Sequence, residues 1–295
     1  MLANTSTLCK CMEASKRSLE MSHTDDATPT GHAARTLSEE DRQKLKKQDS
    51  RLVSSFQALQ LEKNAKKHWD LFYKRNETRF FKDRHWTTRE FFELVGSADE
   101  TRTLLEVGCG VGNLIYPLIE EGMNFFVYAC DLSPRAVDFV KSNEKYDETK
   151  MKAFQCDITS EDIFTVIPDN SVDIVTLIFV LSAIHPDNFV VTLSNIFKIL
   201  KSGGLLLLRD YGLFDMAQLR FKPGNKISDN FYMRQDGTRS YFFSEECLKD
   251  LLVQCGFEVI ENSYVQRKTI NLKEDIDADR VFIQGKYRKP PVEQA

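Results

Sequence analysis

The residues of this chain that could do chemistry begin with a glycine-rich turn. Residues 106–113 read EVGCGVGN: Glu106 opens the run, glycines stand at Gly108, Gly110 and Gly112, and Asn113 closes it. An apolar strand pattern precedes this turn and a helical pattern follows it. In α/β sheets such a place binds nucleotide-like ligands, because glycines and free N–H groups let a ligand approach closely. The dinucleotide fingerprint G-x-G-x-x-G would need glycine at 113, where this chain has asparagine.

Two acids follow at the ends of the next two expected strands. Asp131 could accept hydrogen bonds from both hydroxyls of a ribose, or it could simply precede Ser133, a helix N-cap. Asp157, followed by Ile158, is placed to accept from an adenine amine. Ile178, which ends the next strand, would close one face of the adenine or ribose, or belong to the plain core. Three successive strand ends therefore predict a nucleoside cofactor site.

Alternating strand and helix patterns from about residue 103 predict the sheet that positions these groups. Alternation of this kind is typical of a parallel, doubly wound α/β sheet. The expected strands are 103–107, 125–130, 151–155, 172–179, 204–210, 257–265 and 279–287, with helices that start near 112, 133, 160, 187 and 244. Residues 211–243 break the rhythm with the turns Pro223-Gly224 and Asp236-Gly237, so we expect an insertion that ends in a hairpin.

An arm precedes the sheet. Residues 1–37 lack apolar periodicity and predict a disordered tail, and order is expected to begin at Ser38, an N-cap with Asp41 three residues on. Apolar residues then recur at helical spacing, at Leu45, Leu52, Phe56, Leu59, Ala65, Trp69, Phe72 and Tyr73. Residues 60–90 hold nine Lys or Arg against five Asp or Glu, which fits either a solvated helix face or a nucleic-acid contact.

Composition limits the class of protein. The 295 residues carry a formal net charge of -4, which excludes a globally basic nucleic-acid binder but permits a local basic surface. We expect no membrane association, because no apolar run reaches the length of a span. The seven cysteines show no metal-ligand spacing, so we expect no metal, and reduced thiols in the cytoplasm or nucleus. We divide the chain into a tail (1–37), an arm (38–96), a sheet domain (97–289) with the insertion 211–243, and a tail (290–295).

Longer motifs extend the argument from a site to a family. The turn at 106–112, with its leading acid and G-x-G-x-G spacing, resembles the first motif of class I S-adenosylmethionine (SAM) methyltransferases. Further motifs are KHWDLFYKRN (67–76), FFKDRHWTTREF (80–91), LEVGCG (105–110), FVLSAIHP (179–186), LRDYG (208–212) and RQDGTRSYF (234–242). Over residues 38–289 these motifs resemble the eukaryotic tRNA 3-methylcytidine methyltransferases, and the block 67–91 most resembles their serine-tRNA branch.

The resemblance implies a Rossmann-like, seven-stranded, mostly parallel sheet, with SAM as methyl donor and S-adenosylhomocysteine (SAH) as product. At matched positions it implies SAM contacts from Trp69, Tyr73, Gly108, Asp131, Asp157 and Ile178. Trp69 and Tyr73 lie four residues apart on one helix face, so we expect that helix to cover the cofactor. The resemblance also implies N3 of a cytidine in the anticodon loop of serine tRNAs as substrate and seryl-tRNA synthetase as a partner. We expect a monomer.

The implied reaction is an in-line displacement at the SAM methyl group. Cytosine N3 has a free lone pair, so positioning would supply most of the catalysis without a strong base. Positive charge develops on the ring, and a nearby carboxylate would stabilise it. We expect Asp210 to face the base, with Tyr211 or His185 as a second contact. The alternative is that Arg209 and Asp210 form only an ion pair.

The target base is expected to be splayed out of a loop, because N3 is paired inside a duplex. Aromatic side chains would stack on nucleotides and cations would meet phosphates. The expected RNA contacts are Arg84, His85, Trp86, Arg89, Arg220, Phe231, Tyr232, Arg234, Arg239, Tyr241 and Phe242. An ordinary surface hairpin is the alternative for residues 234–239.

Two other functions would use the same cofactor site. A methyltransferase for a small molecule or a protein would not need the basic, aromatic arm at 60–91. A non-catalytic SAM-binding subunit would only scaffold a partner, and the acids at 131, 157 and 210 argue against such a loss of catalysis.

Overall fold

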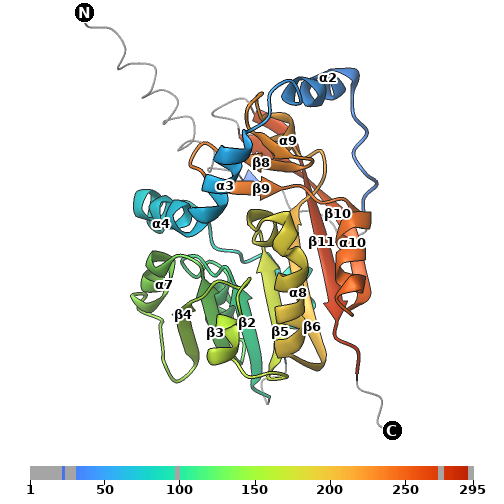
Figure 1. Ribbon diagram of the computed structural model, residues 1–295. Helices are drawn as coiled ribbons and strands as arrows, with labels where there is room; N and C mark the ends of the chain where they lie inside the picture. Colours follow the sequence, from blue (N-terminus) through green and yellow to red (C-terminus); the bar gives the residue numbers. More distant parts are fainter. Residues whose placement is uncertain (1–21, 24–30, 97–99, 272–275, 292–295) are drawn as a thin grey trace, which may run out of the picture.

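A central sheet organises the chain. The computed structural model describes residues 22–23, 31–96, 100–271 and 276–291. Its main sheet has the strand order β1-β10-β11-β6-β5-β2-β3-β4 (Figure 1). The strands are β1 Ser22–His23, β2 Arg102–Val107, β3 Phe125–Asp131, β4 Met151–Gln155, β5 Val172–Ile178, β6 Leu200–Tyr211, β10 Glu258–Asn271 and β11 Ile276–Arg288. Apart from the two-residue β1, this is the predicted seven-stranded, mostly parallel sheet, and the prediction is confirmed.

The parallel part of the sheet contains a point where the strand order reverses. β2 pairs in parallel with β3 on one side and with β5 on the other. β4 continues outward from β3, and β6 continues outward from β5. β11 then pairs antiparallel with β6, and β10 antiparallel with β11. Ligands of α/β proteins bind at the carboxyl ends of the strands beside such a reversal, here between β2 and β5.

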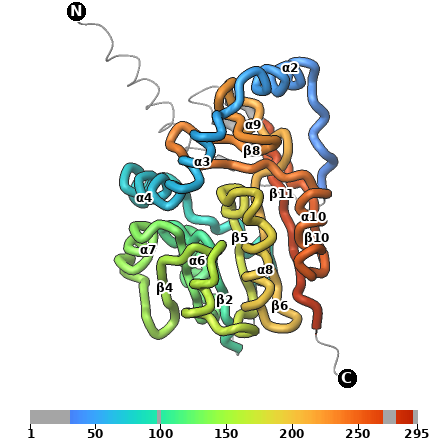
Figure 2. The backbone as a smooth tube through the Cα atoms, viewed as in Figure 1, coloured from blue at the N-terminus to red at the C-terminus, as the bar shows by residue number. Residues whose placement is uncertain are grey.

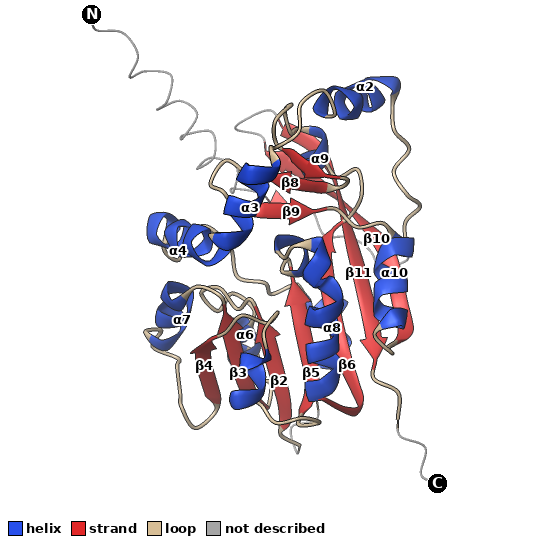
Figure 3. Ribbon diagram, in the orientation of Figure 1, coloured by secondary structure: helices blue, strands red, loops and turns tan. Residues whose placement is uncertain are grey.

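Helices cover both faces of the sheet (Figure 3). One face is packed by α6 (Ile115–Glu120), α7 (Pro134–Lys141) and the 3-10 turn η1 (Phe92–Leu94), the other by η2 (Glu161–Thr165), α8 (Phe189–Ile199) and α10 (Glu245–Gln254). Two shorter turns, η3 (Leu181–Ala183) and η4 (Pro186–Asn188), lead from β5 into α8. Ser133 starts α7 by accepting the Ala136 N–H at 3.3 Å, as its N-cap position predicts.

The arm is a chain of separate helices. They are α2 (Glu39–Gln48), α3 (Ser55–Lys63), α4 (Ala65–Asn76) and α5 (Thr87–Glu90). Ser38 caps α2 by accepting the Asp41 N–H at 3.1 Å, as predicted. The expected continuous apolar stripe is wrong, because Leu52, Phe56 and Leu59 are 51%, 73% and 64% exposed. The chain turns between α2 and α3 and again at Asn64, so the faces of the helices do not line up.

The insertion after β6 forms a small second sheet on which the arm rests. It contains α9 (Met216–Leu219) and the antiparallel strands β7 (Lys226–Ser228), β8 (Phe231–Met233) and β9 (Arg239–Tyr241). The predicted hairpin joins β8 to β9. The Gln48 amide donates to the Gln218 carbonyl at 2.9 Å, and the Val53 N–H donates to the Lys226 carbonyl at 2.8 Å. Figure 2 shows the arm running along this insertion and across the end of the main sheet.

Part of the predicted N-terminal tail is built into the structure. The His32 N–H donates to the Tyr264 carbonyl at 3.0 Å, and Arg35 pairs with Asp41 at 3.4 Å. Most of the rest of 1–37, and residues 292–295 of the other tail, lie outside the described residues. Among the described helices we find none with the length and apolarity of a membrane span. The described chain also holds no group of three or more His, Cys, Asp or Glu that could bind a metal ion.

A buried ion cluster joins α5 to two strands of the main sheet. Glu90 is 6% exposed and accepts from Arg209 of β6 and, at 2.8 Å, from Arg267 of β10. The Arg209 guanidinium also lies 4.3 Å from the centroid of the Trp86 ring. Burial lowers the pKa of Arg209 to about 10, and the charge of Glu90 opposes that shift. Arg209 thus pairs with Glu90, and the alternative of an Arg209–Asp210 ion pair is wrong.

Removing Glu90 should destabilise the protein strongly, because two cations would be left without their shared anion in a buried place. We expect Glu90→Ala to lower the free energy of unfolding by roughly 3–5 kcal/mol. Chemical denaturation measures this loss. Glu39→Gln, which breaks an exposed pair with Arg42, is the control and should cost less than about 1 kcal/mol. An unchanged midpoint for Glu90→Ala would contradict the assignment.

Candidate cofactor and active site

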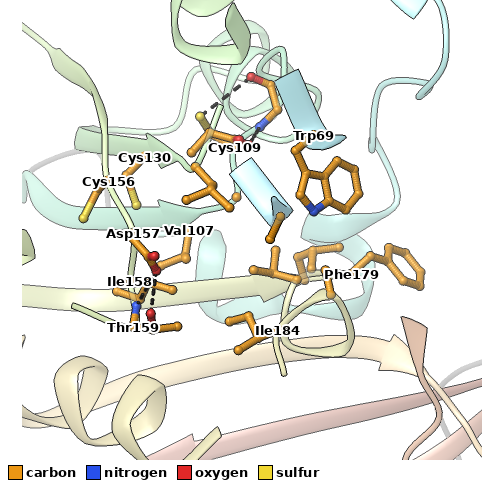
Figure 4. Close-up of a pocket in the computed structure, with 18 of the residues that line it drawn as sticks. Trp69, Val107, Cys109, Cys130, Cys156, Asp157, Ile158, Thr159, Phe179 and Ile184 are labelled. Atoms are coloured by element: carbon orange, nitrogen blue, oxygen red, sulfur yellow. Dashed lines mark hydrogen bonds between the residues drawn. The ribbon is translucent and has the colours of Figure 1, made fainter. Parts of the chain in front are cut away.

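A cavity opens where the parallel strands of the sheet end. It holds about 1000 Å³, open solvent at its mouth included. The ends of β2, β3, β4 and β5 form one side, and the inner side of α4 forms the other (Figure 4). A volume of this order suits a cofactor or drug-sized ligand. The cavity therefore lies beside the reversal of strand order, where the sequence predicts a nucleoside cofactor.

The glycine-rich turn after β2 needs its glycines for two physical reasons. Gly108 and Gly110 line the cavity and have positive φ, at 64° and 55°. A Cβ on Gly108 would come within 2.5 Å of the Val180 side chain, and one on Gly110 within 2.9 Å of the Tyr73 hydroxyl. Neither position therefore admits a side chain without strain. Gly112, also expected to bind the cofactor, is buried behind them and outside the lining.

Asp131, at the end of β3, is anchored by backbone N–H groups on both sides. One carboxylate oxygen accepts from Gly110 at 3.0 Å, and the other accepts from Ser133 at 2.9 Å. Burial raises the pKa of Asp131 to about 6, although these donors favour the charged form. The side chain lines the cavity, and each oxygen keeps a lone pair that can accept from a ligand hydroxyl.

Asp157, Ile158 and Ile178 form the next part of the wall, and Figure 4 labels the first two. One oxygen of Asp157 accepts the N–H and the hydroxyl of Thr159, at 3.0 and 2.7 Å. Ile158 and Ile178 are buried and line the cavity on either side. Aliphatic walls beside one carboxylate suit a flat, apolar ring that carries a hydrogen-bond donor. This is the environment that the predicted adenine site requires.

Asn113 fastens the segment after α4 to the glycine-rich turn. Its amide donates to the Asp83 carboxylate at 3.0 Å and to the Phe81 carbonyl at 3.3 Å. The backbone carbonyl of Asn113 accepts the backbone N–H of Arg84 at 2.7 Å. These bonds carry Arg84 into the lining of the cavity. Arg84, expected on an outer RNA surface, is therefore a wall residue of the site.

Glu106 lies behind that wall and acts on the cavity through Arg84. It is 1% exposed, with one carboxylate oxygen 3.7 Å from the Arg84 guanidinium. The other oxygen has no hydrogen-bond partner in the described chain. Burial raises the pKa of Glu106 to about 8, and the positive charge of Arg84 opposes that rise. Glu106 was expected to bind the cofactor, but the structure places it outside the lining.

Helix α4 covers the cavity with two aromatic side chains, as the four-residue spacing predicts. Trp69 and Tyr73 both line the cavity, with ring centroids 6.3 Å apart. Phe72, beside them, packs with Val111 of the glycine-rich turn and Ala136 of α7. These contacts bring a helix of the arm against the sheet domain, so the arm completes the wall of the cavity.

Phe179 stands at a strained point just after β5. Its φ is 60°, a left-handed conformation that costs a residue with a side chain roughly 1–2 kcal/mol. Its N–H donates to the Arg209 carbonyl at 2.7 Å, which holds the backbone in this turn. The ring lines the cavity and packs against Tyr211, with centroids 5.2 Å apart. Strain held at a cavity wall indicates a functional demand on this ring.

The remaining wall is built by the arm, the insertion and the segment that leads into α8. Arg239 of β9 pairs with Glu62 at the end of α3, and the Asn188 amide lies 3.5 Å from the same carboxylate. His185 lines the cavity, with its ring centroid 5.4 Å from that of Phe231. Arg239, expected on an open RNA surface, is thus 5% exposed in the wall.

Asp210 is buried behind the cavity. It is 0% exposed and accepts the N–H groups of Ser182 and Tyr211, both at 2.9 Å. Burial raises the pKa of Asp210 to about 6. Among the described residues that form the lining, neither Asp210 nor Tyr211 is present. The carboxylate therefore supports the segment 179–185 from behind and does not face the cavity.

The aromatic side chains expected to stack on RNA are largely inside the protein. Phe231, Tyr232 and Phe242 are 0%, 2% and 1% exposed. Tyr241 is half-buried, with its ring centroid 5.2 Å from that of Phe189. Phe231, Tyr232 and Phe242 therefore belong to the core of the insertion, and these three rings offer no open face to a nucleotide.

The other expected RNA contacts differ in how far their side chains are exposed to solvent. Trp86 packs on Arg209, and the Arg234 guanidinium lies 5.3 Å from the Tyr211 ring centroid. His85, Arg89 and Arg220 are exposed.

Sequence reasoning missed several wall residues. The cavity is also lined by Glu62, Ala65, Phe81, Phe179, Val180 and Asn188. Phe179 and Val180 lie in the motif 179–186, which could have indicated that they line the site. Nothing in the local sequence pattern distinguishes Glu62 or Asn188 in this way. The fold alone brings these two together.

Comparisons with known proteins agree with this geometry. A family model described as a methyltransferase domain matches residues 47–262. The chain is 56% identical over 268 residues to the tRNA N(3)-cytidine methyltransferase METTL6 of Mus musculus, covering 90% of this chain and 95% of that protein. It is 43% identical over 241 residues to the tRNA N(3)-methylcytidine methyltransferase trm141 of Schizosaccharomyces pombe, covering 80% and 97%.

Solved structures agree on the fold. A SAM-dependent methyltransferase from Anabaena variabilis matches with a TM-score of 0.54 at 12% identity, covering 77% of this chain and 95% of that one. The sheet is the class I SAM-dependent methyltransferase fold, and the cavity lies at its strand reversal, where ligands of α/β proteins bind. Together with the family match over most of the chain, these findings show that the chain belongs to the tRNA N(3)-cytidine methyltransferase family.

Proposed function

We propose that this protein transfers the methyl group of SAM to N3 of a cytidine in the anticodon loop of tRNA. The observation that carries the proposal is the 56% identity, over 90% of the chain, to a tRNA N(3)-cytidine methyltransferase. In the cavity, the SAM ribose would bind Asp131, and the adenine would lie between Ile158 and Ile178 with its amine at Asp157. The methionine end would then lie along the glycine-rich turn.

The reaction is an in-line displacement. The N3 lone pair attacks the methyl carbon, and the N3–C bond forms as the S–C bond breaks. The electron pair of that bond stays on sulfur, which gives SAH. The cytosine ring becomes cationic as it gains the methyl group. No base acts during methyl transfer, so alignment of the two reactants supplies most of the rate enhancement.

We assign the target base to the wall near Phe179 and Arg84. The Phe179 ring offers an apolar face for stacking, and the Arg84 guanidinium lies 6.0 Å from its centroid. Arg84 would meet the nucleotide that enters the cavity, and His185 would be a contact on the opposite wall. Asp210 would act from behind, by holding the segment 179–185 through Ser182 and by placing negative charge near the developing cation.

We assign the flanking RNA strand to the outer face of α3 and α4. Six exposed cations on α3, on α4 and in the segment that follows α4 form no ion pair with a carboxylate of the described chain: Lys63, Lys66, Lys67, Lys74, Arg75 and Lys82. The acids nearby are engaged, since Asp70 pairs with Arg135 and Glu77 with Arg79. Phe56 of α3 is 73% exposed and offers a ring for base stacking. A methyltransferase that acts on a small molecule or a protein would not need this basic face.

Neutralising this face should weaken tRNA binding mainly by removing phosphate contacts. We expect the variant K63Q/K66Q/K67Q to bind tRNA several-fold more weakly, and each lost contact to reduce the salt slope of the affinity by about 0.7–0.9. Fluorescence anisotropy at several KCl concentrations measures both. K150Q/K152Q/K249Q removes the same charge from exposed sites around β4 and α10, and serves as the control. An equal loss in the control would contradict the assignment.

Serine isoacceptors are the tRNAs that we propose, with seryl-tRNA synthetase as a helper. The block 67–91 supports this choice by its resemblance, and the net charge of -4 supports weak binding of tRNA by the protein alone. The described cysteines 109, 130, 156, 247 and 255 are free thiols, which supports a reducing compartment such as the cytoplasm or nucleus. We propose a monomer as the working state.

Methyl transfer from labelled SAM to total tRNA, followed by nucleoside mass analysis, tests the function. We expect 3-methylcytidine in serine tRNA, in larger amount when seryl-tRNA synthetase is present. Asp131→Ala, which removes the proposed ribose acceptor, is the inactive control. A labelled nucleoside other than 3-methylcytidine, or no tRNA product while SAM is bound, would reject the proposal.

SAM affinity should fall in acid, because a protonated Asp131 accepts ribose hydroxyls poorly. Burial raises the pKa of Asp131 from 3.8 to about 6, so the association constant should fall below about pH 6, by at most tenfold per pH unit. In the free protein, the raised pKa of Asp131 has the opposite effect on folding: it makes the folded state more stable in acid than at neutral pH. The stability it contributes is fully present below the unfolded pKa and is lost as pH rises through the folded pKa.

Calorimetric titration with SAM between about pH 5 and pH 8 measures this dependence. Asp131→Asn should bind weakly with a flat profile. Asp210→Asn should keep the wild-type profile, since Asp210 shares the pKa of about 6 but does not line the cavity. A profile that Asp131→Asn leaves unchanged would refute this assignment.

A further inference from the structure

The roof of the cofactor cavity is a helix that does not belong to the sheet domain. Trp69 and Tyr73 on the inner side of α4 line the cavity, and the Tyr73 hydroxyl packs against Gly110. A cofactor beneath these rings is held between α4 and the strand ends. Movement of α4 away from the turn would widen the path by which SAH leaves and SAM enters. The contacts that hold α4 in place therefore bear on cofactor exchange.

The first of these contacts joins α4 to the start of α7. Asp70 accepts the Ser133 hydroxyl at 3.0 Å and pairs with the Arg135 guanidinium at 3.4 Å. Ser133 in turn donates its N–H to Asp131, the proposed ribose acceptor. The negative charge of Asp70 also lies at the positive end of the α7 dipole. Asp70 is thus linked through a single residue, Ser133, to Asp131, the proposed ribose acceptor.

The second contact joins the end of α3, just before α4, to the insertion. Glu62 pairs with Arg239, whose side chain is 5% exposed, so the loss of Glu62 leaves a poorly solvated positive charge. The Asn188 amide lies 3.5 Å from the same carboxylate. Nearby, Gly237 packs closely on α4, since a Cβ there would come within 2.9 Å of the His68 ring.

We propose that Asp70 and the Glu62–Arg239 pair are two clamps that set the rate of cofactor exchange. Asp70 holds α4 to α7, and Glu62–Arg239 holds the preceding turn of the arm to the insertion. Release of either clamp lets α4 lift from the glycine-rich turn. None of the three is assigned to the reacting atoms, so they are positioning residues. The inference rests on the SAM site and not on the identity of the RNA.

Release of labelled SAH, chased with excess unlabelled SAH in the absence of RNA, tests the first clamp. We expect Asp70→Ala to raise the dissociation rate about tenfold, and to raise KM for SAM while kcat changes by less than about threefold. Asp138→Ala removes an exposed acid from α7 and is the matched control. It should release SAH at the wild-type rate.

A double-mutant cycle tests the second clamp. Glu62→Gln and Arg239→Gln should each speed SAH release, and the double variant should be no faster than the faster single variant, because the two side chains form one pair. Combining Glu62→Gln with Asp70→Ala should multiply the two effects, because these clamps share no partner.

Two results would overturn the proposal. One is SAH release within about twofold of wild type in both Asp70→Ala and Glu62→Gln. The other is a lower melting temperature without faster release, which would show that the contacts only support the fold. Because SAH release is measured without RNA, failure of that measurement leaves the assignment of the methylated nucleoside untouched, and failure of that assignment leaves the release rates standing.

Discussion

Asp131 accepts hydrogen bonds from the backbone N–H groups of Gly110 and Ser133, and so a single buried carboxylate fixes three things together. It sets the conformation of the glycine-rich turn, the start of α7 and the place where a ribose can bind. Burying this charge is costly, as the pKa of about 6 shows, and the two N–H donors offset part of the cost. The site is therefore organised before a ligand arrives.

Helix α4 depends on this arrangement and separates two different electrostatic environments. Its inner side covers a cavity with Asp131 and Asp157 in the wall, which suits the cationic sulfonium of SAM. Its outer side carries Lys67, Lys74 and Arg75 toward solvent, which suits a polyanion. A helix is roughly 10 Å across, so SAM and the flanking RNA strand can contact one element from opposite sides while the target base enters the cavity. The net charge of -4 of the whole chain does not reveal that the two sides of α4 face regions of opposite charge.

Sequence reasoning succeeded where a local pattern determines the structure. Strand periodicity and the acids at strand ends predicted the sheet and placed Asp131 and Asp157 correctly in the cavity wall. It failed for the RNA surface, because the burial of Phe231 and Tyr232 depends on how the insertion folds as a second sheet. The positive φ of Phe179 likewise results from the fold around β5, and no sequence pattern predicts it.

The arm is synthesised first, yet the groups that hold it in place are synthesised late. Glu62 and Arg239 are 177 residues apart, and Gln48 meets a carbonyl 170 residues further on. As the chain leaves the ribosome, α4 therefore emerges long before the insertion that steadies it. A nascent or truncated chain that stops short of β9 lacks part of the cavity wall. If the SAM site is the cavity proposed here, retention of SAM would require that translation has passed the insertion.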